Sequence, residues 1–166
     1  MTLATSFPDG TVPKSPSYVC GMPRAPTLDE ATIIAILRAA DRLRRRYAPL
    51  LARHGVTLQQ YNVLRILRGA GPAGLPTLTL VDRMIEQAPG ITRLLARLVR
   101  KGWVRRRRDG DDRRVVICRI TAAGRRLLRQ LDGPVAAADR AAVAILPPRR
   151  RTQVVALLSP IAHEAP

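Results

Sequence analysis

Apolar residues recur at helical spacing through most of the chain that follows residue 26. The first run repeats every three or four positions, as one face of an amphipathic helix does. Its members are Ile33, Ile34, Leu37, Ala40, Leu43, Tyr47, Leu50 and Leu51. Thr27 and Glu30 precede the run with the spacing of a capping box. We therefore expect one long helix over residues 27–54, with a bend at Pro49.

Two shorter helical segments follow. The first begins at Thr57 and ends before Gly71, and we expect its inner side to carry Tyr61, Val63, Leu64 and Leu67. The second covers residues 76–84, and its expected apolar side is Leu78, Val81 and Met84. Both are short enough to need a shared core for stability.

A basic amphipathic helix is expected over residues 88–101. Pro89 suits its first turn, where the missing N–H is not needed, and Gly102 suits its C-terminal cap. The expected buried stripe is Ile91, Leu94, Leu95 and Leu98. The opposite face carries Gly90, Thr92, Arg93, Ala96, Arg97 and Arg100.

A charged hairpin is expected next. Residues 103–108 and 115–120 are strand-like, and the turn-forming sequence Asp-Gly-Asp-Asp at 109–112 separates them. Side chains alternate between the two faces of a strand, so only about half of the arginines at 105–108 can face one partner. Asp109 and Asp111 are expected to be turn residues.

The two ends of the chain differ in character. Thr121 begins a helix that we expect to run through an alanine-rich stretch to about residue 145, and a last helix covers residues 149–163. Residues 1–26 hold five prolines and several Gly, Ser and Thr. Such a segment cannot bury enough apolar surface to order itself, so we expect a disordered tail there.

Composition favours a helical protein with a polyanionic partner. Hydrophobic residues make up 46% of the 166 residues but aromatic residues only 3%, so the core consists of Leu, Ile, Val and Ala. The net charge is +17 and the pI is near 11.7. Self-repulsion of this size is best tolerated when the partner is itself anionic. Nucleic acid is the first candidate partner and an anionic membrane surface is the second.

Several protein classes are disfavoured by the sequence. The N-terminus MTLATSFPDG lacks the features of a signal peptide, and no apolar run reaches the roughly 18 residues of a membrane span. Cys20 and Cys118 make neither a disulfide framework nor a metal motif. No nucleophile with a histidine base, no carboxylate pair and no phosphate loop indicates an enzyme. We expect a soluble, cytoplasmic, non-catalytic protein without cofactor or metal.

A few residues admit a functional or a purely structural interpretation. Cys118 is expected to be a small buried residue of a strand, and redox sensing by Cys20 is the less favoured interpretation. His54 and His163 each end a helix, where a cation is favourable, so metal binding is disfavoured. Tyr61 is expected in the core rather than against a ligand.

A short helix, a tight turn and a basic helix together indicate a helix-turn-helix, whose second helix enters the major groove. Arg93 and Arg97 are four residues apart and share one helix face. An arginine fork can pair with both O6 and N7 of a guanine. Pro89 and Gly90 are small enough to let the helix N-terminus approach a phosphate. The alternative is that Arg93 and Arg97 simply form a solvent-exposed helix face without a DNA-binding role.

Beyond this pattern, the sequence resembles the MarR family of winged-helix transcription regulators. The motifs that carry the resemblance are Thr-Arg-Leu-Leu at 92–95, Gly102 with Val104, Asp112-Arg113-Arg114, and Ile-Thr-Ala-Ala-Gly at 120–124. Residues 57–67 resemble the family's second helix, so the likeness covers about residues 28–131. Trp103 stands where an aliphatic residue is commoner.

The resemblance implies a mainly α fold with a small β-hairpin wing, in which dimerisation helices flank a winged helix-turn-helix core. The implied parts are a tail at 1–26, a dimerisation helix at 27–56, a DNA-binding domain at 57–121 and C-terminal dimerisation helices at 122–166. A homodimer would bind double-stranded DNA, with helix 88–101 in the major groove and wing 104–120 in the minor groove. The family is most often repressive and often responds to a small aromatic or phenolic effector.

Carried over by residue, the resemblance implies a set of DNA-contacting positions. Asp112 would brace the wing by pairing with a nearby arginine, Arg114 in the favoured assignment, which leaves Arg113 to reach the minor groove; the reverse assignment stays open. The whole implied DNA-binding set is Pro89, Gly90, Thr92, Arg93, Arg97, Arg113 and Arg114.

An RNA-binding or architectural nucleoid protein is the competing hypothesis. Readers of single-stranded RNA display aromatic stacking platforms, whereas this chain has one Phe, one Trp and three Tyr, none clustered with the arginines. The effector, the operator, the target genes and the sign of regulation are not encoded in any pattern identified in the sequence.

Overall fold

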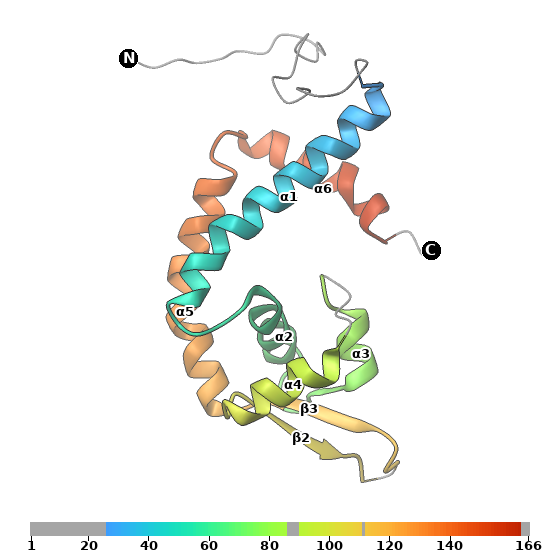
Figure 1. Ribbon diagram of the computed structural model, residues 1–166, viewed down its shortest axis with the longest axis vertical. Coiled ribbons are helices and arrows are strands. Elements are labelled where there is room, and N and C mark those ends of the chain that lie inside the picture. Colours follow the sequence, from blue (N-terminus) through green and yellow to red (C-terminus); the bar gives the residue numbers. More distant parts are fainter. Residues whose placement is uncertain (1–25, 86–89, 111, 164–166) are drawn as a thin grey trace. The chain divides into compact units, whose positions relative to one another are not determined.

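The computed structural model describes residues 26–85, 90–110 and 112–163 (Figure 1). It comprises two compact units, which meet at Asp41 and Arg42 and are described separately. Residues 1–25 of the expected tail at 1–26 lie outside the described residues, as do Pro89 and Asp111. Within the described ranges, no helix is both long and apolar enough to cross a membrane.

The first unit contains the N-terminal half of helix α1 (Leu28–Ala52). The expected capping box is present: the Thr27 backbone N–H donates to Glu30 Oε2 at 2.8 Å, and the Glu30 N–H donates to Thr27 Oγ1 at 3.2 Å. Leu28, Ile33 and Leu37 are exposed. Within its own unit, this half of α1 therefore presents apolar side chains at its surface.

In the second unit, helix α2 (Leu58–Gly69) lies at the centre of the core. Thr57 caps it, and a second capping box joins Thr57 to Gln60 with two hydrogen bonds of 3.2 Å. The expected inner residues Tyr61, Val63, Leu64 and Leu67 are all buried. Tyr61 is thus a core residue, as predicted.

Helix α3 (Thr77–Asp82) corrects the predicted apolar side of this segment. Leu78 was expected inward but is 79% exposed, whereas Leu80 is fully buried. The reason is the short length of the helix, which begins at Thr77 because Pro76 is its N-cap. The Thr77 hydroxyl donates to Val116 O at 3.0 Å, and this bond directs Leu80 and Met84, three and seven residues later, to the core.

Helix α4 (Ile91–Arg100) begins later than the predicted residue 88. Its N-cap, Gly90, has a φ of 98°, which is a left-handed conformation that no α-helical residue has. Leu94, Leu95 and Leu98 are buried as predicted, and Ile91 packs partly buried against the same core.

The C-terminal end of α4 is a Schellman motif. The Gly102 N–H donates to Val99 O at 2.8 Å, and the Trp103 N–H donates to Leu98 O at 3.0 Å. Gly102 has a φ of 70°, so the position favours glycine, as the sequence predicted for the end of this helix.

The sheet has three antiparallel strands in the order β1 (Leu75–Pro76), β3 (Val116–Ile120) and β2 (Val104–Arg108). Both strands of the hairpin agree with the prediction to within one residue. The two-residue strand β1 was not predicted; it pairs Leu75 with Cys118. Gly74 precedes it with a φ of 73° and lies so close to β3 that an added Cβ would be 2.3 Å from Cys118 O.

Two helices complete the second unit. Helix α5 (Ala122–Ala142) is capped by Thr121, whose Oγ1 accepts from the Gly124 N–H at 3.1 Å. Helix α6 (Pro148–His163) begins one residue before the predicted position. The buried residues of α5 are Gly124, Leu127, Leu128, Leu131 and Val135. Val155, Leu157 and Ile161 of α6 are exposed.

Polar bonds join α5 to α1 and α2. The Tyr47 hydroxyl donates a short hydrogen bond to Asp139 Oδ1, and Arg68 donates from Nη1 to both carboxylate oxygens of Asp132 at 2.9 Å. Burial and the bond to Asp139 raise the pKa of Tyr47 to about 12. The neutral phenol is therefore favoured in the folded state.

The pKa of Tyr47 predicts a loss of stability at alkaline pH. Between the ordinary pKa of 10 and the folded value of about 12, the unfolded chain has lost the phenolic proton while the folded chain retains it. The free energy of unfolding therefore falls as pH rises through this window. Urea denaturation across this pH range should show a shallower decline for Tyr47→Phe, and parallel declines would contradict the prediction.

Candidate nucleic-acid interface

The exposed face of α4 carries the residues that the sequence singled out. Thr92, Arg93 and Arg97 are exposed, and so is Gly90 at the N-cap. Because Leu94, Leu95 and Leu98 are buried on the other side, the helix can rotate little about its axis without exposing leucine. The core thus fixes which way Arg93 and Arg97 face.

Lys101 anchors the C-terminal end of α4 in a way that the sequence did not reveal. Its Nζ donates to Gly55 O in the turn between α1 and α2 at 2.5 Å, and it lies 4.6 Å from the ring centroid of Trp103. A cation over an aromatic face is attracted to it. Lys101 therefore has a structural role, and the aromatic residue at 103 supplies part of it.

The turn of the hairpin is held by backbone bonds of its aspartates. The Arg114 N–H donates to Asp112 Oδ1 at 2.8 Å, and the Val115 N–H donates to Asp112 O at 3.0 Å. Gly110 N–H donates to Asp109 Oδ1 at 2.7 Å, as expected of a turn residue. The predicted partner of Asp112 was a guanidinium; the hydrogen bond found is to the backbone of Arg114.

This bond leaves both arginine side chains of the turn in solvent. Arg113 and Arg114 are exposed. An aspartate that accepts its own chain's N–H two residues later forms an Asx turn, which fixes the local backbone. Asp112 can therefore shape the turn without taking a positive charge away from its tip.

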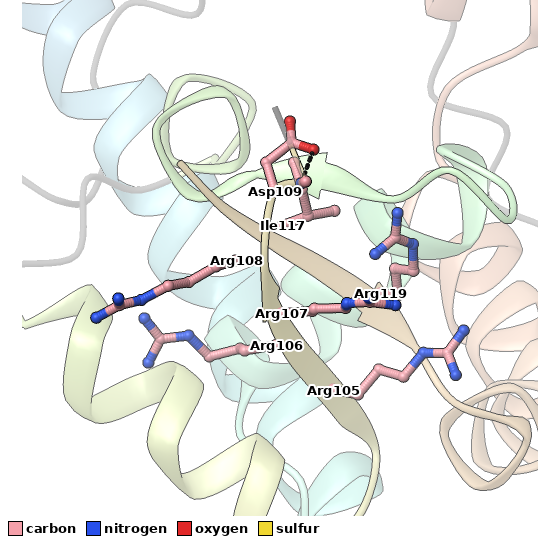
Figure 2. Close-up of a pocket in the computed structure, with 8 residues that line it drawn as sticks. Arg105, Arg106, Arg107, Arg108, Asp109, Ile117 and Arg119 are labelled. Atoms are coloured by element: carbon pink, nitrogen blue, oxygen red, sulfur yellow. Dashed lines mark hydrogen bonds between the residues drawn. The ribbon is translucent and has the colours of Figure 1, made fainter. Parts of the chain in front are cut away.

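The register divides the arginines of β2 between two faces. Val104 pairs with Ile120 and Arg106 pairs with Cys118, and the three apolar partners are buried. Arg105, Arg107 and Arg119 extend to the opposite side from Arg106 and Arg108 (Figure 2). The sheet thus has an inner face continuous with the core and an outer face that we call the outer arginine face, made of Arg105, Arg107 and Arg119.

The remaining candidate residues have structural surroundings. Cys118 is fully buried, with its Sγ 3.6 Å from Thr77 Oγ1. His54 is exposed, and in the described ranges no group of three or more His, Cys, Asp or Glu residues could hold a metal ion. Cys20 lies outside the described residues, and so does the side chain of His163.

Comparisons with known proteins place this arrangement among DNA-binding regulators. The family model described as "MarR family" matches residues 56–116. The chain is 37% identical over 106 residues to the HTH-type transcriptional regulator TtmR of Methylorubrum extorquens (strain PA1). This match covers 64% of the chain but 53% of TtmR, so the chain spans about half the length of that relative.

Solved structures agree over a larger part of the chain. A MarR transcription factor from Planctomyces limnophilus is 33% identical, with a TM-score of 0.63 over 82% of this chain and 98% of that one. A mutant MarR from E. coli in complex with operator DNA is 24% identical, with a TM-score of 0.72 over 82% of this chain and 99% of that one. The second likeness concerns the fold alone.

Proposed function

The chain belongs to the MarR family of DNA-binding transcription regulators, and we propose that it recognises a pseudo-palindromic operator as a homodimer. The observation that carries this proposal is the exposed position of Arg93 and Arg97 opposite the buried leucines of α4. Two arginine forks on one face, four residues apart, suit adjacent base edges in a major groove. A mutant MarR of the same fold was solved in complex with operator DNA, which supports DNA as the partner.

Within this proposal, α4 reads the bases and its N-terminus contacts the backbone. Gly90 has no side chain to obstruct a phosphate, and no side chain of the described residues caps the N-terminus of α4. Thr92 is exposed beside them. Pro89, outside the described residues, remains a candidate contact from the sequence.

We assign the minor groove to the hairpin tip. Arg113 and Arg114 are both exposed there, and the Asx turn of Asp112 holds the backbone that carries them. The narrow minor groove attracts arginine through its enhanced negative potential. Because Asp112 binds a backbone N–H, either arginine is free to enter the groove.

The dimer proposal rests on apolar side chains that the described residues leave uncovered. They lie on the N-terminal half of α1 and, separately, on α6. Large exposed apolar side chains on one helix face mark interaction surfaces. We assign residues 27–56 and 122–166 to dimerisation and 57–121 to DNA binding. We also propose a repressive role and a small aromatic or phenolic effector, as is common in the family.

Selection from a random duplex pool tests operator recognition. We expect a motif of two inverted half-sites about 10 bp apart from centre to centre, and an affinity that falls steeply with salt as phosphate contacts release counterions. If the selection yields no inverted repeat at moderate salt, the proposal of sequence-specific recognition is contradicted. Stronger binding to single-stranded RNA than to duplex would favour the RNA-binding alternative instead.

A further inference from the structure

The outer arginine face has a cross-strand arrangement that is unfavourable without a partner. Arg105 pairs directly with Arg119 across the β2–β3 ladder. Like charges opposite one another in a sheet destabilise it. Arg107 pairs with Ile117 on the same face, so no acid lies directly opposite Arg105 or Arg107. Such an unfavourable pairing of like charges is expected at positions where the residues serve a function.

A hollow of about 690 Å³ lies along β2, lined by the outer arginine face and also by Arg106 and Arg108, which extend to the other side of the strand. Its lining contains five arginines and one acid, Asp109, whose Oδ1 already accepts the Gly110 N–H. Arg119 is half-buried, and its Nε donates to Pro72 O at 3.1 Å. That bond holds the guanidinium of Arg119 in place across the ladder from the exposed Arg105, so part of the ordering cost of binding an anion is already met.

The free edge of β2 adds backbone donors to the hollow. The Asp109 N–H donates to Val115 O and the Thr121 N–H donates to Trp103 O, so the odd-numbered residues of β2 face β3. Hydrogen-bonded and non-bonded pairs alternate in an antiparallel ladder. The backbone N–H groups of Arg106 and Arg108 therefore point away from the sheet, at an edge where no described strand pairs.

We propose that the outer arginine face, with the free edge of β2, binds a DNA phosphate backbone outside the segment that α4 reads. This proposal rests on the proposed function, since it adds a second phosphate contact to a DNA-bound protein. The outer face is opposite to the inner face that continues into the core. Phosphate is the chemistry that guanidinium forks and free N–H groups bind in common.

The source of that backbone is either the flank of the operator or a second duplex. Protection of a sheet edge against aggregation also uses charged residues, but it requires neither an anchored Arg119 nor a concave lining. Protection against aggregation would work equally well with lysine or arginine, whereas phosphate binding depends on the planar guanidinium of arginine.

The first measurement is the salt dependence of binding to a mixed-sequence duplex of about 20 bp, roughly two helical turns. Each phosphate neutralised contributes about 0.9 to the slope of log K against log salt. Arg105→Gln with Arg107→Gln should lower the slope by about 2. The control pair Arg129→Gln and Arg140→Gln removes the same charge from exposed positions of α5. Neither residue is one of the exposed apolar residues of α1 and α6 on which the dimer proposal rests, so with the size of the assembly checked to be that of the wild type, this pair should leave the slope unchanged.

Because this binding reads phosphates alone, the result does not depend on an operator being found. A slope for Arg105→Gln/Arg107→Gln equal to that of the control pair would overturn the proposal, whatever the outcome of the operator selection. Arg105→Lys with Arg107→Lys separates charge from the fork: it should keep most of the slope but weaken affinity.

Duplex length then identifies the source. If the flank is bound, a selected operator extended by about 10 bp on each side, one helical turn, should bind more tightly to the wild type, and the double glutamine variant should lose this gain. If a second duplex is bound, the gain is absent and the wild type, but not the variant, should join two differently labelled duplexes. If the wild type shows neither the gain in affinity nor the joining of two duplexes, the proposal is contradicted.

Discussion

Gly74→Ala is expected to destabilise the protein by about 2–5 kcal/mol. A residue with a side chain loses about 1–2 kcal/mol in the left-handed conformation that Gly74 adopts. The new Cβ would also lie 2.3 Å from Cys118 O and 2.5 Å from Arg119 Cγ, and overpacking of this kind costs about 1–3 kcal/mol more. Because the first of these contacts is with backbone, β1 must move away from β3.

Gly71→Ala is the matched control for this substitution. Gly71 has a φ of 68°, close to the 73° of Gly74, but an added Cβ would meet nothing within 4 Å. Thermal unfolding should show a fall in Tm on the order of 10 °C for Gly74→Ala and a much smaller one for Gly71→Ala. Equal shifts would mean that the approach of β1 to β3 contributes nothing beyond the backbone conformation.

Arg93→Ala and Arg97→Ala are expected to weaken binding to a selected operator by about 1–3 kcal/mol each, which is roughly 5- to 150-fold. A bidentate contact to a guanine carries discrimination as well as affinity. Each alanine variant should therefore accept more bases at one position of each half-site. Quantitative binding to the operator and to its single-base variants measures both effects.

Two further variants define what the arginines do. Arg97→Lys keeps the charge but loses the planar fork, so it should keep affinity for mixed-sequence duplex while losing sequence preference. Arg129→Ala, at an exposed position of α5 and not among the apolar residues on which the dimer proposal rests, should leave both unchanged while the assembly keeps its wild-type size. If Arg93→Ala weakened binding to all sequences equally, it would be a phosphate contact rather than a base contact.

The long elements were predictable because their signals are local. Thr57 with Gln60, Thr121 before α5 and the leucines of α4 act within one or two helical turns. The hairpin was equally evident from Asp109 to Asp112. Spacing along the chain therefore sufficed to place the exposed face that carries Arg93 and Arg97.

The short elements were not predictable for the same reason. Strand β1 has two residues, one of them Pro76, and it exists because Gly74 permits a close approach to β3, which lies some forty residues later. The apolar side of α3 was misjudged because a six-residue helix gives too few positions to establish a period. In both cases contacts distant in sequence decide the conformation.

The bonds of individual polar groups were also beyond the sequence. From the sequence, Asp112 could bind either the side chain or the backbone N–H of Arg114, and in the folded turn it accepts from the backbone N–H. Lys101 binds Gly55 O, a contact between residues 46 positions apart. Nothing in the local pattern distinguishes Lys101 from the other cations of α4.

The carbonyl-bound cations set a limit on how this surface can be redesigned. Lys101, Arg119 and Arg125 donate to Gly55 O, Pro72 O and Ile120 O. In a library that neutralises every Lys and Arg from 93 to 126, these three positions would be selected for expression and folding, and the remaining ten for affinity. A variant engineered for lower charge should therefore retain these three residues, because their hydrogen bonds to backbone carbonyl groups stabilise the fold that positions the other ten.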